Sequence, residues 1–151
     1  MNFDLIIKKL SQMESYLNEL ETFILSRNPE EIKKDPTLLH TAERLVQVLV
    51  DTMIDINIHI LLSKEKTYDK TQSTFLLLGE MGILPEEFAK KIAPIVGLRN
   101  ILVHRYEELD KDLFIKNLFK NKNDFKKYIV AIYDFIEKER KQNSKKSLSD
   151  F

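Results

Sequence analysis

Residues 99–106, which read RNILVHRY, bring together a guanidinium, a carboxamide, an imidazole and a phenol. Arg99 carries a planar, permanently charged fork that binds phosphate, and His104 can exchange a proton near neutral pH. A phosphate-binding group beside a proton-transfer group is the minimum needed to cut a phosphodiester bond without a metal ion. The octapeptide is therefore the candidate catalytic centre of the chain.

A helix through this segment would place Asn100 and His104 one turn apart on the same stripe, because each residue turns by about 100°. The long side chain of Arg99 can swing to join them. Tyr106 lies two turns beyond Arg99 along nearly the same line, provided that the helix continues that far. The spacing alone also fits a solvated Arg and a His near a helix C-terminus, where the helix dipole favours positive charge.

A second polar group follows the row Glu43, Gln47, Asp51, Asp55 and His59, in which each residue is four positions after the last. Such a row drifts slowly around one helix. One interpretation is a polar face with internal pairs, and the other is that part of the row borders a site. We expect Asp55 and His59 to support the site and Glu43 to contribute less.

The elements that must position these residues are all helical, because apolar residues recur at three- and four-residue steps and never alternate for long. Asp35-Pro36 is a typical helix start, and Pro94 predicts a kink or a local break. The expected helices cover residues 3–27, 36–63, 67–79, 84 into the octapeptide, 113–119 and 125–142, with a connector at 28–36.

The chain has 151 residues, which suits one domain with its own core; we assign it to residues 1–142, followed by a polar, disordered tail at 143–151. The formal net charge is zero, although residues 120–146 hold nine Lys or Arg against four Asp or Glu. There is no Cys and no pair of His at ligand spacing, so we expect no metal site and no cofactor. Without a signal peptide or a long uncharged apolar run, the cytoplasm is the expected location and no membrane contact is expected.

The spacing of Arg99, His104 and Tyr106 resembles the R-x4–6-H motif with its trailing Tyr in HepT-like HEPN proteins, the toxins of prokaryotic toxin–antitoxin pairs. The likeness extends to residues 41–47, 54–60 and 68–82, the last with a Gly-Glu-x-Gly-Ile turn. It covers most of residues 1–140 in order and spacing.

This resemblance implies an all-α, HEPN-type antiparallel bundle of four to five helices, homodimeric, with the active cleft at the dimer interface. It also implies a metal-independent endoribonuclease toxin of a type VII-like pair. By matching position, Arg99 and His104 would be the catalytic pair, and Asn100 the polar residue that follows the Arg. Tyr106 would be the residue that a nucleotidyltransferase antitoxin adenylylates to silence the toxin.

Two-fold symmetry would explain why the family acts as a dimer, since one chain supplies only one His in the motif and two copies supply two. The main alternative is a non-catalytic helical dimer module that binds a nucleotidyltransferase partner. Nucleotide binding is a further alternative, although the chain has no Gly-rich phosphate loop.

Overall fold

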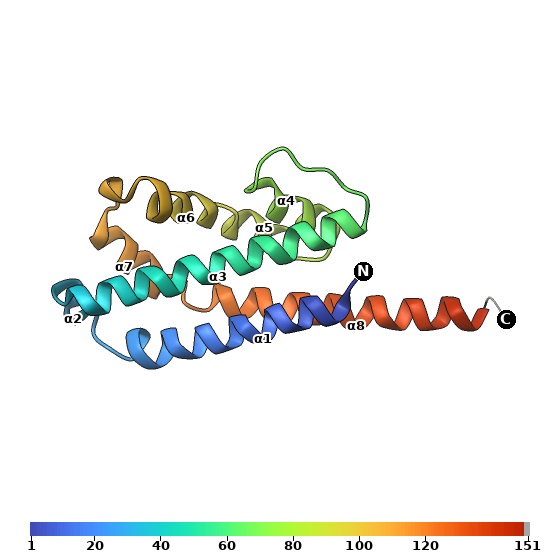
Figure 1. Ribbon diagram of the computed structural model, residues 1–151, viewed down its shortest axis with the longest axis horizontal. Helices are drawn as coiled ribbons and strands as arrows, with labels where there is room; N and C mark the ends of the chain where they lie inside the picture. The colour runs from blue at the N-terminus through green and yellow to red at the C-terminus, as the bar shows by residue number, and fades with distance from the viewer. Residues whose placement is uncertain (150–151) are drawn as a thin grey trace.

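The longest helix, α3 (Pro36–Ser63), runs through the middle of the molecule in the computed structural model, which describes residues 1–149 and side chains as far as residue 146 (Figure 1). The Asp35 carboxylate accepts hydrogen bonds from the backbone N–H groups of Thr37 and Leu38, at 3.0 and 3.4 Å. Pro36 occupies the first helical position, where it costs no hydrogen bond. These local signals explain why both predicted ends of this helix are confirmed.

Two layers of helices cover α3 (Figure 1). On one side lie α1 (Phe3–Leu20) and α8 (Asp124–Ser149), and α1 continues as a π-helical turn, η1 (Glu21–Leu25). On the other side lie α4 (Ser73–Glu80), α5 (Glu86–Ile92) and α6 (Ile95–His104). The helices α2 (Pro29–Lys34) and α7 (Lys111–Lys120) pack against each other at the end where α3 begins. The predicted all-α bundle is confirmed.

A polar network in the core ties α3 to α4 and α8. Tyr128 is fully buried, and its hydroxyl donates to Oδ1 of Asn57 at 2.6 Å and to the carbonyl of Met53 at 3.1 Å. Asn57 in turn donates to the Thr74 hydroxyl at 3.2 Å. Because every buried side-chain polar atom in the described part of the chain has a partner, the network holds three helices together without an unsatisfied group.

The placement of α6 depends on a tight junction between α4 and α5. Gly79 lies so close to α5 that a Cβ atom added to it would stand 2.6 Å from Cβ of Ala89. Gly82 turns the chain with φ of +72°, a left-handed conformation that favours glycine. At Pro94 the helix breaks, as predicted, so α6 starts a new direction toward α3.

Three predicted element bounds are wrong. The connector at 28–36 contains the helix α2, because Asn28 caps the N–H of Glu30 and Pro29 fits the first turn. The helix expected from residue 67 starts only at Ser73, after an irregular segment. The last helix continues past Gln142 to Ser149. Whether residues 143–151 behave as a tail stays a prediction, and residues 150 and 151 lie outside the described part.

By length and composition alone, α3 is apolar enough to cross a membrane. However, 56% of its most apolar window is buried inside the bundle, and α1, α4 and α6 pack against it. This burial is what a central helix of a folded domain requires.

Candidate functional site

Arg99 lies on the side of α6 that faces α3, where Asp51 holds it. The Nε–H of Arg99 donates to Oδ1 of Asp51 at 2.6 Å, and Nη1 donates to Oδ1 of Asn100 at 3.3 Å. The Arg99 side chain keeps 28% of its surface exposed, so the ion pair sits at a surface rather than in the core. These two bonds fix the plane of the guanidinium and leave Nη2 without a hydrogen bond among the described residues.

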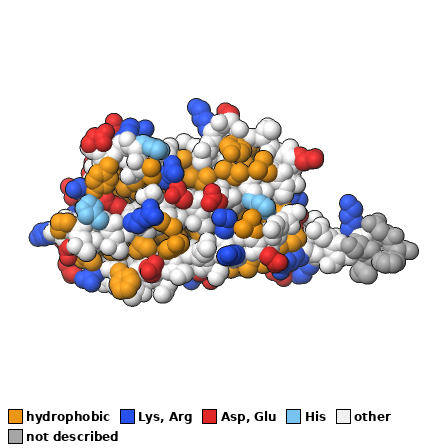
Figure 2. All heavy atoms as spheres, viewed as in Figure 1, with side chains coloured by type: hydrophobic (Ala, Val, Ile, Leu, Met, Phe, Trp, Pro, Cys, Tyr) orange, Lys and Arg blue, Asp and Glu red, His pale blue; other side chains and the backbone are white. Residues whose placement is uncertain are grey.

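A cleft of about 370 Å³ opens beside this ion pair. Its lining joins the predicted site residues Arg99, Asn100 and Asp55. The full lining consists of Asp51, Ile54, Asp55, Thr71, Val96, Arg99 and Asn100. On the face shown in Figure 2, basic and acidic side chains interrupt the hydrophobic patches, so neither sign of charge dominates. This face displays no long basic track, and Arg99 is the one cationic residue in the cleft lining.

His104 is the last residue of α6 and is exposed to solvent. It lies one helical turn after Asn100, as the spacing predicts, yet it does not line the cleft. The next residue, Arg105, leaves the helix with φ of −140°. The imidazole therefore sits at the open end of the motif, where a second molecule can reach it.

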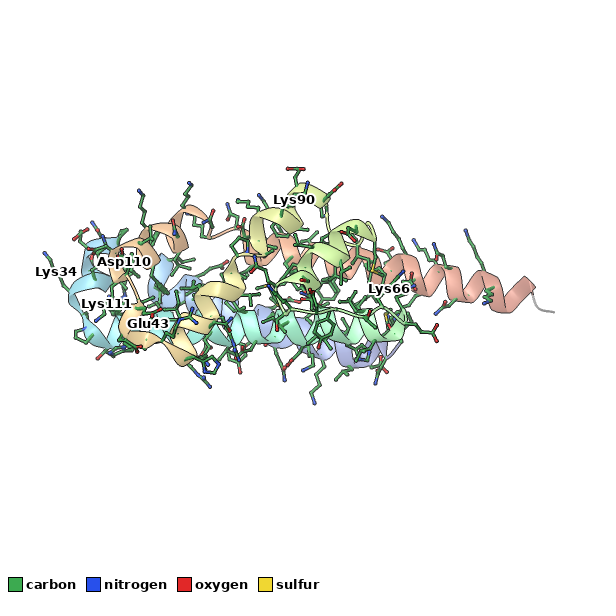
Figure 3. All side chains as sticks on the ribbon, turned by 90° about the horizontal axis from the view of Figure 1, so that it is seen from above. Lys34, Glu43, Lys66, Lys90, Asp110 and Lys111 are labelled. Carbon is green, nitrogen blue, oxygen red and sulfur yellow. The ribbon has the colours of Figure 1, made fainter. Side chains whose placement is uncertain are left out.

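Tyr106 does not continue the helix, so the condition under which it would lie along the line of Arg99 is not met. It opens a short 3-10 turn, η2 (Tyr106–Glu108), because the backbone turns at Arg105. Its hydroxyl lies 2.7 Å from both carboxylate oxygens of Glu43 on α3. Figure 3 shows Glu43 at the end of the bundle that also holds Asp110 and Lys111, where α7 begins.

The Glu43 carboxylate is unusual because only 7% of its side-chain surface is exposed. Nδ1 of His40 lies 3.1 Å from its Oε1 atom, and 3.5 Å from the Tyr106 hydroxyl oxygen. Burial of the phenol and its hydrogen bond to Glu43 raise the pKa of Tyr106 from 10.0 to about 12. Tyr106 thus remains a neutral donor at neutral pH while keeping 38% of its surface exposed.

Asp55 and His59 make different contacts. Asp55 borders the cleft and forms an ion pair of 3.4 Å with Lys9 of α1. His59 lies outside the cleft lining, and its Nε2 atom accepts a hydrogen bond of 3.3 Å from the backbone N–H of Asn2. Their role in supporting the site stays a prediction, which the position of Asp55 favours more than that of His59.

Sequence reasoning missed the partners that hold the motif, Asp51 for Arg99 and the pair Glu43 and His40 for Tyr106. The signal was present in part, because Glu43 and Asp51 belong to the four-residue row on α3. The row does not say which of its members face α6, since that depends on how the helices pack. No cluster of three or more His, Cys, Asp or Glu side chains that could hold a metal ion occurs in the described part of the chain.

Comparison with known proteins adds independent evidence. The family model described as Ribonuclease HepT-like matches residues 13–132. The chain is 39% identical over 113 residues to the tRNA nuclease HepT of Aphanizomenon flos-aquae, covering 70% of this chain and 72% of the relative. It is 26% identical over 132 residues to the mRNA nuclease HepT of Shewanella oneidensis, covering 85% and 96%.

A solved structure gives the same picture of the fold. The tri-AMPylated HEPN toxin of Shewanella oneidensis, in complex with its MNT antitoxin, superposes with a TM-score of 0.78 at 26% identity. The match covers 89% of this chain and 99% of the toxin. The helical arrangement described above is therefore that of a HEPN toxin.

Proposed function

Because this chain belongs to the HepT-like ribonuclease family, we propose that it is the endoribonuclease toxin of a toxin–antitoxin pair and acts in the cytoplasm. Arg99 and His104 are its catalytic pair, and the cleavage needs no metal ion. The observation that carries this proposal is the way in which Asp51 orients Arg99 beside a cleft, five residues before an exposed imidazole, while Nη2 of Arg99 has no hydrogen bond among the described residues.

The chemistry follows from the residues present. Cleavage through a ribose 2′-hydroxyl needs a base for that hydroxyl, an acid for the leaving 5′-oxygen and a cation for the charge on phosphorus. Arg99 supplies the cation with its planar fork. His104 supplies one of the two proton transfers, and a second imidazole is required for the other.

A homodimer provides that second imidazole. A two-fold axis through the site would present the same patch twice and give two His104 and two Arg99 side chains. Exposed apolar surface next to the motif supports this arrangement, because Val103 and Tyr106 expose 39% and 38% of their surfaces. The complete active site is then shared by two copies.

Regulation by a nucleotidyltransferase partner fits the position of Tyr106. An AMP group on its hydroxyl would add bulk and negative charge one residue beyond Arg105 and close to the motif. The similarity to a tri-AMPylated toxin supports this assignment. In this proposal the antitoxin silences the toxin by adenylylating Tyr106. The side-chain amide N–H of Asn100 donates to the RNA phosphate, while Asp55 and His59 support the site from α3.

The test is cleavage of total tRNA and of a transcribed mRNA by the purified chain in the presence of EDTA. We expect His104→Ala and Arg99→Ala to lose at least about 100-fold in rate, because each removes a group that acts in the transition state. Tyr106→Phe serves as a control that keeps both catalytic groups. Wild-type cleavage by His104→Ala would overturn the catalytic assignment and would favour the non-catalytic binding module.

A further inference from the structure

The buried carboxylate of Glu43 is the only acidic group among the described residues that contacts the Tyr106 hydroxyl. Both of its oxygens lie 2.7 Å from that hydroxyl oxygen, which is the length of a strong O–H···O⁻ bond. A carboxylate with 7% exposure is costly to keep in a protein unless it performs a role or is well paired. The contact is also long-range, since 63 positions separate the two residues.

We propose that Glu43 is the proton acceptor for adenylylation of Tyr106, and that His40 positions its carboxylate. This inference rests on the proposed function, in which Tyr106 is the modified residue. It assigns a role in regulation to a residue of α3 that lies outside the R-x4-H motif.

The step is a nucleotidyl transfer from ATP bound to the partner transferase. The Tyr106 hydroxyl oxygen forms a bond to the α-phosphorus as the bond from that phosphorus to pyrophosphate breaks. The phenolic proton moves to Glu43 in the same step, so pyrophosphate leaves with the electrons of the broken bond. Glu43 returns the proton to water once the modified Tyr106 no longer donates to it.

A base is needed because Tyr106 is a poor nucleophile on its own. Burial and the neighbouring carboxylate raise the pKa of Tyr106 to about 12, so free phenolate is scarce at neutral pH. A weak nucleophile in this state is activated by an adjacent base that takes the proton during attack. Glu43 already accepts that hydrogen bond, so no rearrangement is required before the transfer.

His40 completes the arrangement from the solvent side. Its Nδ1 atom lies 3.1 Å from Oε1 of Glu43, and 61% of its side chain is exposed. With a proton on Nδ1, it donates to the carboxylate and fixes the direction of the remaining lone pairs, as the third group of a catalytic triad does. His40 is a positioning residue, because it touches the reacting oxygen only at 3.5 Å.

The same molecule contains a matched pair that serves as a control. The Tyr133 hydroxyl donates to Oε1 of Glu14 at 2.6 Å, between α8 and α1, and the pKa of Tyr133 is also raised to about 12. Tyr133 therefore forms the same kind of tyrosine–glutamate hydrogen bond on a different pair of helices, with an exposed glutamate in place of the buried Glu43. Glu14→Gln removes the same kind of carboxylate without touching the motif.

The experiment measures transfer of AMP from ATP labelled at the α-phosphate, using the 151-residue chain and a purified nucleotidyltransferase antitoxin, with mass spectrometry to locate the label. We expect Glu43→Gln to slow labelling of Tyr106 by about 100-fold or more, since the amide keeps the shape but cannot take a proton. Glu43→Asp should recover part of the rate, and Glu14→Gln should label like the wild type. The difference in labelling rate between Glu43→Gln and the wild type should decrease as pH rises, because hydroxide replaces the lost base.

The outcomes separate this inference from the proposed function. Failure to label the wild type, or a label that persists in Tyr106→Phe, contradicts Tyr106 as the modified residue. A label that vanishes in Tyr106→Phe but forms at the wild-type rate in Glu43→Gln overturns the role of Glu43 and leaves the proposed function intact. A constant deficit at every pH, with no recovery in Glu43→Asp, shows a purely structural role and also overturns it.

Discussion

The Nε–H of Arg99 donates to Oδ1 of Asp51 across 2.6 Å, and this ion pair joins α6 to the middle of α3. Two turns earlier on α3, the Glu43 carboxylate accepts a hydrogen bond from the hydroxyl of Tyr106. The helix α6 and the turn after it are thus held by two carboxylates of one row on α3. Each carboxylate sets the orientation of one functional side chain.

Asp51→Asn should lower the rate constant of RNA cleavage by about tenfold with little change in KM. The amide keeps the shape of the side chain but loses the charge-assisted bond that orients the guanidinium, and misplaced catalytic groups cost mainly kcat. Steady-state kinetics with a short RNA checks this. Asp112→Asn is the control, because that exposed carboxylate pairs with Lys33, at 3.6 Å, and does not line the cleft. A rise in KM alone would contradict an orienting role.

Arg99→Lys should cleave RNA at least about tenfold more slowly than the wild type, although it keeps the positive charge. Lysine is a point charge without the planar fork, so it cannot hold Asp51 and a phosphate at once in the same geometry. Arg105→Lys is the matched control, since Arg105 pairs with Glu108 at 2.9 Å and lies beyond the helix. Equal activities of the two variants would argue against recognition by the guanidinium.

The wild-type chain should form a particle of twice its 17.8 kDa mass in light scattering after gel filtration. If both copies contribute to one site, equal mixing and exchange with His104→Ala should leave about a quarter of the wild-type activity, because only a quarter of the dimers hold two intact copies. If each copy held an independent site, half of the wild-type activity would remain. A monomeric particle with full activity would contradict the shared site.

Tyr106→Phe should lower the free energy of unfolding by about 1 kcal/mol, because the buried Glu43 carboxylate loses one of its two partners. For a domain of this size, that loss corresponds to a fall in Tm of roughly 2–4 °C. Thermal unfolding followed by circular dichroism at neutral pH measures it. Tyr68→Phe is the control, as this tyrosine is 37% exposed and its hydroxyl has no partner among the described residues. An equal Tm for both variants would mean that the Glu43 contact contributes nothing to stability.

Stability should fall in alkali as pH rises from the ordinary phenol pKa of 10.0 toward about 12. Folding raises the pKa of Tyr106, Tyr128 and Tyr133. At pH values below 10.0 all three phenols are protonated in both the folded and the unfolded state, so their full contribution to the free energy of unfolding is present. Above that value the unfolded phenols lose their protons first, which favours unfolding. Denaturant unfolding at increasing pH tests the slope. In a phenolate absorbance titration of the native chain, Tyr106→Phe should remove one late-titrating group.

The bounds of α3 could be predicted because its signals are local. Asp35 and Pro36 mark its start, and the apolar repeat continues without a break to Ser63. The start of α4 could not, since residues 67–72 contain good helix formers but form an irregular segment, in which the Asp69 carboxylate accepts hydrogen bonds from the Lys70 backbone N–H and the Ser73 hydroxyl. The short helix α2 was hidden because Asn28-Pro29 looks like a helix breaker when it is in fact a cap followed by a first turn.

The site was predictable in its residue types and only partly in its contacts. Arg99, Asn100 and Asp55 meet at the cleft, as expected from the motif and the row on α3. The pairing of Arg99 with Asp51 depends on how α6 crosses α3, because 48 positions separate the two residues in the sequence. Whether the helix continues to Tyr106 could not be decided from the sequence, because no Gly or Pro marks the turn at Arg105.

The close packing of α4 against α5 at Gly79 adds this residue to those on which toxicity would depend. A methyl group there would collide with Ala89 and push α5 outward, and α6 would move with it. In a growth selection for chains that no longer harm their host, changes at Gly79 should therefore be recovered beside changes at Arg99 and His104. The selection would then identify a position at which the residue has no side chain that could contact RNA.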